Sequence, residues 1–209
     1  MHELIQKIRE KLRSPSLGDA AHNPMIGYKR AEPFEARLMD PPAKESGVMM
    51  LLFQRNEVWH TLFMMRPDGK GVHSNQLSFP GGKLEPGENW KEAALRETFE
   101  EIGVKPDDIE IIGELSELYI PPSHFIVKPF VGILKDEPAF SPNADEVFAL
   151  IEEPVEHFLR ENIIAEKDIF IPKYNQQIRV KYYDVQGHTL WGATAMIVQE
   201  FRMIMGYEL

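Results

Sequence analysis

The segment GGKLEPGENWKEAALRETFEEIGV, residues 81–104, constrains the chain more than any other stretch. It places Glu97, Glu100 and Glu101 at spacings i, i+3 and i+4, and residues so spaced share one face of a helix. Two carboxylates about 5 Å apart repel one another by roughly 3 kcal/mol at an effective dielectric constant near 20. A solvated acidic face is the simplest explanation of such a pattern, and a bound cation is the other.

Local signals predict a helix over residues 90–102. Asn89 is a typical N-cap residue, and Glu92 three positions later completes a variant of the capping box. Gly103 is a typical residue to end the helix, because glycine adopts the left-handed conformation at little cost. The sequence therefore predicts both ends of the helix that carries the three glutamates.

The predicted helix is amphipathic. Leu95, Phe99 and Ile102 lie opposite the glutamates, so we expect these three side chains to face the core. Hard divalent cations prefer several oxygen ligands. Three carboxylates on one face, together with backbone carbonyls from the preceding Gly-Gly turn, supply such ligands, so we interpret the acidic face as a cation site.

The remaining patterns predict a single α+β domain over residues 1–209. Its core spans about residues 45–200, and an amphipathic N-terminal helix extends it. Strands are predicted over 47–54, 58–65, 77–84, 109–118, 125–134 and 178–185, and helices over 1–12, 90–102, 154–162 and 191–205.

Composition limits the partners of the chain. The formal net charge is −10, which argues against a nucleic-acid binder that needs a basic surface. It leaves anionic substrates open, because a bound divalent cation reverses the local sign of the charge. The longest apolar run, GVMMLLF, is too short to cross a membrane. The chain has no cysteine and no apolar signal-peptide core, so we expect a cytoplasmic protein without membrane contact.

The acidic segment resembles the Nudix box, G-x5-E-x7-R-E-U-x-E-E-x-G-U, in which U is a bulky aliphatic residue. The residues aligned with this pattern are Gly82, Glu88, Arg96, Glu97, Thr98, Phe99, Glu100, Glu101, Ile102, Gly103 and Val104. Thr98 departs from the pattern, since it occupies a position that is usually aliphatic. It is close to valine in shape, so we expect only a small effect on packing.

The resemblance implies an α/β/α sandwich with a mixed sheet. It also implies hydrolysis of a nucleoside diphosphate linked to another moiety, with Mg²⁺ or Mn²⁺ as the cofactor. Carried over by position, Glu97, Glu100 and Glu101 become metal ligands, and the carbonyl of Gly81 becomes a further one. Arg96 is expected to orient a glutamate of the box through a charge-assisted pair.

The resemblance leaves the general base open between two residues. Such enzymes draw the base either from the box helix, where Glu100 is the candidate, or from a later loop. The segment SPNADEVF, residues 141–148, is similar to that loop, and Glu146 is its candidate. A loop glutamate without a special role remains the alternative for Glu146.

Residues upstream of the box indicate a substrate. LFMMRPDGKGVHSNQLSFPGG, residues 62–82, resembles the signature L-L-T-x-R-[SA]-x3-R-x3-G-x3-F-P-G-G of the coenzyme A diphosphatase subgroup. The residues in register are Leu62, Arg66, Phe79, Pro80, Gly81 and Gly82, and the departures are Met64, Pro67, Gly71 and Asn75. Gly71 replaces an arginine, for which Lys70 or His73 is a nearby substitute. We therefore predict that Arg66, Lys70, His73 and Phe79 contact a small nucleotide substrate.

Three hypotheses remain at this point. The first is a metal-dependent diphosphatase that converts coenzyme A or its thioesters to 3′,5′-ADP and 4′-phosphopantetheine. The second is a Nudix hydrolase of another substrate, such as ADP-ribose or NADH. The third is a Nudix domain that binds a nucleotide as a sensor without hydrolysing it. The resemblance also keeps a homodimer open, because members of the family are often dimeric.

Overall fold

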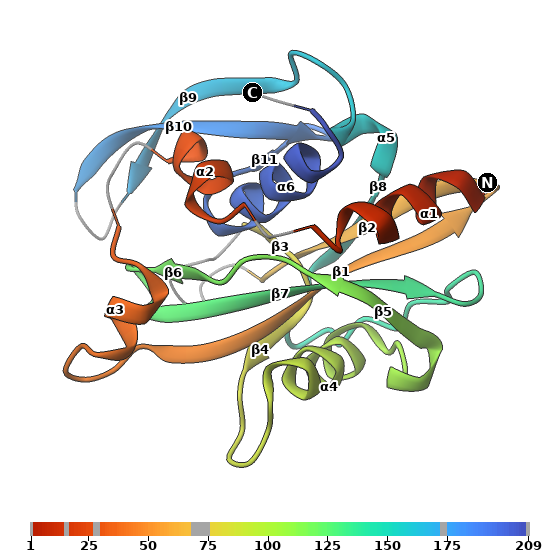
Figure 1. Cartoon of the computed structure of the whole chain (residues 1–209), viewed down its shortest axis with the longest axis horizontal. Helices are drawn as coiled ribbons and strands as arrows, with labels where there is room; N and C mark the ends of the chain where they lie inside the picture. The colour runs from red at the N-terminus through yellow and green to blue at the C-terminus, as the bar shows by residue number, and fades with distance from the viewer. Residues whose placement is uncertain (1, 15–16, 27–29, 68–75, 172–174, 208–209) are drawn as a thin grey trace.

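The computed structural model describes residues 2–14, 17–26, 30–67, 76–171 and 175–207. Within these ranges, an eight-stranded sheet forms the centre of the fold, and a separate three-stranded sheet lies to one side (Figure 1). The helices are α1 (His2–Lys11), α2 (Asp19–His22), α3 (Pro33–Arg37), α4 (Trp90–Ile102), α5 (Val155–Phe158) and α6 (Gly192–Ile204), with short 3-10 turns η1 (Asn23–Met25) and η2 (Pro106–Asp108). The strands are β1 (Lys44–Arg55), β2 (Val58–Met65), β3 (Leu77–Ser78), β4 (Gly81–Lys83), β5 (Ile109–Glu114), β6 (Leu118–Ile120), β7 (Phe125–Leu134), β8 (Ala149–Pro154), β9 (Ile164–Ile171), β10 (Gln176–Val185) and β11 (His188–Leu190).

Strand β1 lies at the centre of the mixed sheet. It runs parallel to β7 and antiparallel to β2 and β4. Successive side chains of a strand point to opposite faces. Accordingly, Met49, Leu51 and Phe53 enter one hydrophobic cluster, whereas Met50 and Leu52 enter another. A strand that is apolar on both faces needs a covering layer on each side.

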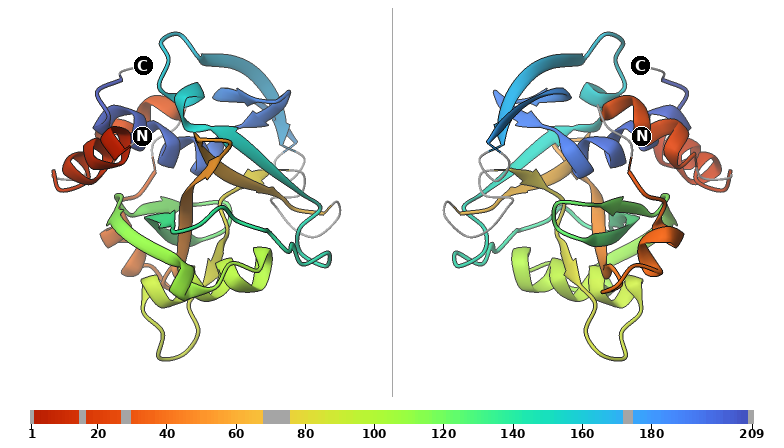
Figure 2. Two further views of the ribbon diagram at one scale, coloured as in Figure 1. Left: turned by 90° about the vertical axis from the view of Figure 1, so that its right-hand side faces the viewer. Right: turned by 90° about the vertical axis from the view of Figure 1, so that its left-hand side faces the viewer.

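Helices supply both layers. On one face, α4 contributes Ala94 and Ile102 to the cluster of Met49. On the other face, α6 contributes Val198 and Phe201 to the cluster of Met50. Figure 2 shows α4 on one side of the sheet and α1, α6 and the three-stranded sheet on the other. The predicted α/β/α sandwich with a mixed sheet is therefore confirmed.

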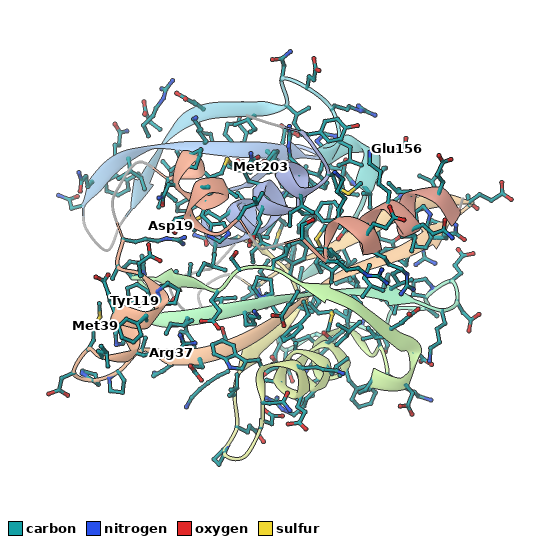
Figure 3. All side chains as sticks on the ribbon, in the orientation of Figure 1. Asp19, Arg37, Met39, Tyr119, Glu156 and Met203 are labelled. Carbon is teal, nitrogen blue, oxygen red and sulfur yellow. The ribbon has the colours of Figure 1, made fainter. Side chains whose placement is uncertain are left out.

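Helix α3 holds one end of the central sheet. Arg37 forms ion pairs with Glu45 of β1 and with Glu117, which precedes β6. The hydroxyl of Tyr119 lies 3.8 Å from the sulfur of Met39, and Figure 3 shows Arg37, Met39 and Tyr119 together at this end. These contacts attach the segment before β1 to the strands that follow the box helix.

Several predicted boundaries were wrong. The strand predicted over 109–118 ends at Glu114, and regular pairing with β7 begins again at Leu118 in β6. The strand predicted over 77–84 is divided into β3 and β4, and the Gly-Gly pair lies in β4 rather than in a turn. The helix predicted over 154–162 is limited to α5, and β8, β9 and β11 were not predicted. No helix in the described ranges is long and apolar enough to cross a membrane.

Candidate active site

The ends of α4 are fixed by the signals that the sequence predicted. The side chain of Asn89 accepts hydrogen bonds from the backbone N–H groups of Lys91 and Glu92 at 3.0 Å, and the Glu92 carboxylate accepts one from the Asn89 N–H at 2.9 Å. Gly103 ends the helix with a φ of 77°, which favours glycine. The helix predicted over 90–102 is confirmed, and it presents its glutamates at a fixed position on the sheet.

The inner face of α4 agrees with the prediction for Ile102, which is buried, and for Leu95, which packs against the same core, but differs at Phe99. Phe99, expected in the core, is 48% exposed, whereas Thr98 and Glu101 are buried together with Ala94. Close approach to the sheet explains the difference, because a methyl group on Gly47 of β1 would overlap the backbone of α4. Only a small side chain fits such a contact, so Ala94 faces the sheet. Thr98, one turn further along the same helix face, is also buried, and Phe99 lies outside this face.

Glu101 is the buried carboxylate of the site, with 1% of its surface exposed. One oxygen accepts a hydrogen bond from the Gly81 N–H at 2.8 Å, and the other accepts one from Arg66 Nη2 at 3.0 Å. Burial raises its pKa to about 7, although Arg66 and the Gly81 N–H act in the opposite direction. The negative charges of Glu97 and Glu146 raise it further.

The carboxylate of Glu97 extends from α4 to Gly82 of β4. A methyl group on Gly82 would overlap the Glu97 carboxylate, so glycine at this position gives the carboxylate its space. Burial raises the pKa of Glu97, and the charges of Glu100 and Glu146 add to that effect, whereas Arg96 opposes it. The pKa shifts of Glu97 and Glu101 have the same cause, because both carboxylates are shielded from solvent and lie near other carboxylates.

Arg96 organises the exposed side of the same face. Its guanidinium binds Glu88 through two hydrogen bonds, at 2.7 and 3.0 Å. It also donates to Glu97 at 2.9 Å, to Glu100 at 3.0 Å and to the Lys83 carbonyl at 3.1 Å. The hydrogen bonds from Arg96 lower the pKa of Glu88 and thereby keep it ionised. Arg96 therefore contacts Glu88, Glu97 and Glu100 at the same time.

The loop after β7 brings Glu146 to the cluster. The Asn143 N–H donates to the carbonyl of Glu101 at 2.9 Å, and the Ser141 N–H donates to the carbonyl of Ile102, also at 2.9 Å. The Asn143 side chain then donates to Glu146 at 3.3 Å. The sequence analysis selected Glu146 but missed Asn143. An asparagine in a loop is typical of an Asx turn, and in the structure the Asn143 side chain accepts a hydrogen bond from the Asp145 N–H.

The donor set of this cluster fits a hard cation. Its side chains offer carboxylate oxygens from one helix face and one loop, and such ligands suit Mg²⁺ or Mn²⁺. In the described part of the chain, no three acidic or histidine side chains converge at metal-binding distance. Instead, guanidinium groups of Arg66 and Arg96 hold Glu97, Glu100 and Glu101. The positive charge that this face requires is thus supplied by the chain itself.

The predicted substrate-binding residues have different positions. Arg66 follows β2 directly and lies at the cluster. Phe79 is 3% exposed and packs against Phe63 at 5.0 Å between ring centroids, so its ring serves the core. Lys70 and His73 lie outside the described residues. Gly81 contacts the cluster through its N–H, whereas the prediction concerned its carbonyl.

Comparison with known proteins agrees with the fold. A profile of the NUDIX domain matches residues 43–174. The uncharacterized Nudix hydrolase NudL of Yersinia enterocolitica is 34% identical over 139 residues, which cover 66% of this chain and 70% of that protein. Nudix hydrolase 3 of Caenorhabditis elegans is 41% identical over 91 residues, and the match spans 42% of this chain but only 38% of that protein.

A solved structure shows the same architecture over nearly the whole chain. The crystal structure of a MutT/nudix family protein from Enterococcus faecalis superposes with a TM-score of 0.54 at 16% identity, covering 97% of this chain and 74% of the other. The NUDIX profile covers more than half of the chain and includes every residue of the carboxylate cluster. The chain therefore belongs to the Nudix hydrolase family and is a pyrophosphohydrolase of nucleotide-linked substrates.

Proposed function

We propose that the enzyme hydrolyses the diphosphate of coenzyme A or of its thioesters and releases 3′,5′-ADP and 4′-phosphopantetheine. The observation that carries this proposal is the register of Arg66 with the segment FPGG at 79–82, which matches the coenzyme A diphosphatase signature. The fold supports a role for this register. Arg66 and Gly81 come from opposite ends of the signature, and both bind the carboxylate of Glu101.

The proposal includes Mg²⁺ or Mn²⁺ held by Glu97, Glu100 and Glu101, with the Gly81 carbonyl as a further ligand. When bound, the cation supplies positive charge that offsets the charge of the diphosphate and acidifies water. The raised pKa values of Glu97 and Glu101 support this assignment. They show that these carboxylates are held in a place that disfavours unneutralised negative charge.

The general base in this proposal is Glu146. It takes a proton from the attacking water as the water oxygen bonds to phosphorus and the bridging P–O bond breaks. Glu100 is the other candidate, but its carboxylate already accepts a hydrogen bond from Arg96 at 3.0 Å. Glu146 accepts a longer bond, 3.3 Å, from the neutral amide of Asn143, which leaves it freer to receive a proton.

Contacts with the rest of the substrate remain part of the proposal. Arg66 is assigned to the diphosphate, and Lys70 and His73 to the 3′-phosphate. Phe79 is not given a substrate contact, because its ring is buried against Phe63. A cytoplasmic setting and a homodimer belong to the same proposal and rest on the family resemblance.

Product identification tests the substrate. Purified enzyme is given coenzyme A, ADP-ribose and NADH in parallel, with Mg²⁺ and then Mn²⁺, and the products are separated by chromatography. We expect 3′,5′-ADP and phosphopantetheine to dominate. Predominant AMP from ADP-ribose or NADH would overturn the coenzyme A assignment and leave the family-level activity intact. Tight binding without turnover of any of the three would indicate a nucleotide sensor instead.

One substitution tests the metal-ligand assignment. Glu101→Gln keeps the shape of the side chain and removes its charge, so we expect kcat to fall by about two orders of magnitude or more while the fold is retained. Glu110→Gln is the matched control, since Glu110 pairs with Arg9 on the surface, away from the cluster. Near-normal activity of Glu101→Gln at saturating Mg²⁺ would exclude Glu101 as a ligand.

A further inference from the structure

Arg66 and Arg96 bind the carboxylate cluster in different ways. Arg96 is anchored to Glu88 by two hydrogen bonds and to the Lys83 carbonyl by a third, so its position does not depend on Glu97 and Glu100 alone. Arg66 donates to Glu101 through Nη2 at 3.0 Å, and its side chain is 35% exposed. One of these guanidinium groups is therefore built into the structure, whereas the other lies at the surface of the site.

Glu101 has both oxygens engaged in this arrangement. The Gly81 N–H holds one oxygen from within the sheet, and Arg66 covers the other from the solvent side. A divalent cation that bound Glu101 would approach the oxygen that Arg66 now covers. Two like charges cannot share a buried carboxylate without strong repulsion, so the cation and the Arg66 guanidinium compete for Glu101.

We propose that Arg66 is an exchangeable counter-ion of the metal site, which neutralises Glu101 in the metal-free enzyme and is released by the divalent cation to bind the substrate diphosphate. This inference rests on the proposed metal site. In this proposal Arg66 binds the Glu101 carboxylate before the metal binds and the phosphate oxygens of the substrate afterwards. A guanidinium group forms strong hydrogen bonds with either partner. The exchange also implies an order of binding, because the diphosphate gains its arginine only after the metal has bound.

Binding of Mn²⁺ without substrate tests the exchange. Free Mn²⁺ is followed by electron paramagnetic resonance during titration of wild type, Arg66→Gln, Arg66→Ala and Arg66→Lys. Removing the competing charge should tighten Mn²⁺ binding about tenfold in Arg66→Gln and Arg66→Ala, whereas Arg66→Lys should stay close to wild type. Arg9→Gln is the control, since it removes one arginine–glutamate pair and the same net charge at a distant surface.

Binding of pyrophosphate supplies the second half of the test. With Mn²⁺ at saturation, calorimetry should show inorganic pyrophosphate bound about tenfold more weakly by Arg66→Gln than by wild type or Arg9→Gln. Opposite changes in the two affinities are the signature of exchange. Weaker or unchanged Mn²⁺ binding by both Arg66→Gln and Arg66→Ala would overturn the exchange alone and make Arg66 a residue that positions Glu101. Failure of wild type to bind Mn²⁺ would overturn the metal site itself, and the exchange with it.

Discussion

Position 82 has no room for a side chain larger than that of glycine, because the Glu97 carboxylate lies directly beside it. A methyl group there would overlap the Glu97 carboxylate. We therefore expect Gly82→Ala to displace Glu97 and to lower kcat/KM at least about tenfold, since small misplacements of active-site groups have effects of that size. The fold should survive, because the displaced atoms belong to the end of a side chain. Steady-state kinetics and thermal unfolding measure the two effects.

Lys83→Ala is the control for that substitution. Lys83 is the next residue of β4, its side chain is exposed, and only its backbone carbonyl contacts Arg96. We expect the Lys83 variant to retain wild-type kinetics. Equal kcat/KM for Gly82→Ala and wild type would mean that Glu97 does not need its present position.

The buried carboxyl of Glu101 makes the stability of the metal-free protein depend on pH. Its pKa is about 7 in the folded protein, whereas the pKa of a glutamate in an unfolded chain is about 4.3, as in model peptides. Between these values the folded state binds more protons, so the Glu101 contribution to the unfolding free energy falls as pH rises and levels off above pH 7. Glu101→Gln lacks this loss, so its stability relative to wild type should rise by about 3 kcal/mol between pH 4.5 and pH 8.

Urea unfolding with a chelator present measures this difference at each pH. Glu110→Gln is again the control, because hydrogen bonding to Arg9 lowers the pKa of Glu110, whereas burial raises that of Glu101. The relative stability of the control should therefore stay level from pH 5 to pH 8. A level curve for Glu101→Gln as well would show that the buried carboxyl has an ordinary pKa.

Helix α4 separates what local sequence determines from what the fold imposes. Asn89, Glu92 and Gly103 act within a few residues of their own position, so the ends of the helix could be predicted. The burial of Glu101 depends on Arg66 and on Gly81 of β4, which lie 35 and 20 positions away in the chain. Helical periodicity alone favoured Phe99 for the core, because it contains no information on how closely the sheet approaches.

The strands that were missed have the same physical explanation. Strand β8 contains adjacent glutamates and ends at Pro154, so its composition does not indicate a strand, yet it pairs with β2 along its whole length. Strand β9 is equally polar and exists as the partner of β10. Pairing between distant segments stabilises both, and context of this kind routinely overrides intrinsic strand propensity.

Helices α2 and α6 are joined by a buried hydrogen-bonded contact. Glu200 of α6 is fully buried and accepts hydrogen bonds from His22 at 2.9 Å and from the hydroxyl and N–H of Ser116 at 2.6 and 3.0 Å. Glu200→Ala would leave these donors buried without their acceptor. We expect the unfolding free energy to fall by about 3–5 kcal/mol, the usual effect of removing one partner of a buried pair.

Chemical denaturation measures that loss. Glu161→Ala is the matched control, because Glu161 is exposed, and such surface substitutions change stability by roughly 0.5 kcal/mol or less. A loss for Glu200→Ala no larger than that of the control would show that the contact contributes little. The two helices would then be held by apolar packing alone.

The N-terminal helix α1 contributes to the main hydrophobic core. Ile5 and Ile8 of α1 enter the same hydrophobic cluster as Met50 of β1 and Phe201 of α6. Arg9 of α1 also pairs with Glu110 of β5. The first and last helices of the chain therefore stabilise the sheet that carries the carboxylate cluster, and we expect the described segments to unfold together.

Ile8→Ala tests this cooperativity. Ile8 is 1% exposed, so the substitution should lower the unfolding free energy by about 2–5 kcal/mol. Circular dichroism and tryptophan fluorescence should shift to the same lower urea midpoint, because the loss acts on one cooperative unit. Leu38→Ala is the control, since Leu38 is 71% exposed on the segment after α3 and its removal should leave the midpoint nearly unchanged. A separate early transition that involves only part of the helical signal would show instead that α1 unfolds independently, and Ile8→Ala would then leave the main transition at its wild-type midpoint.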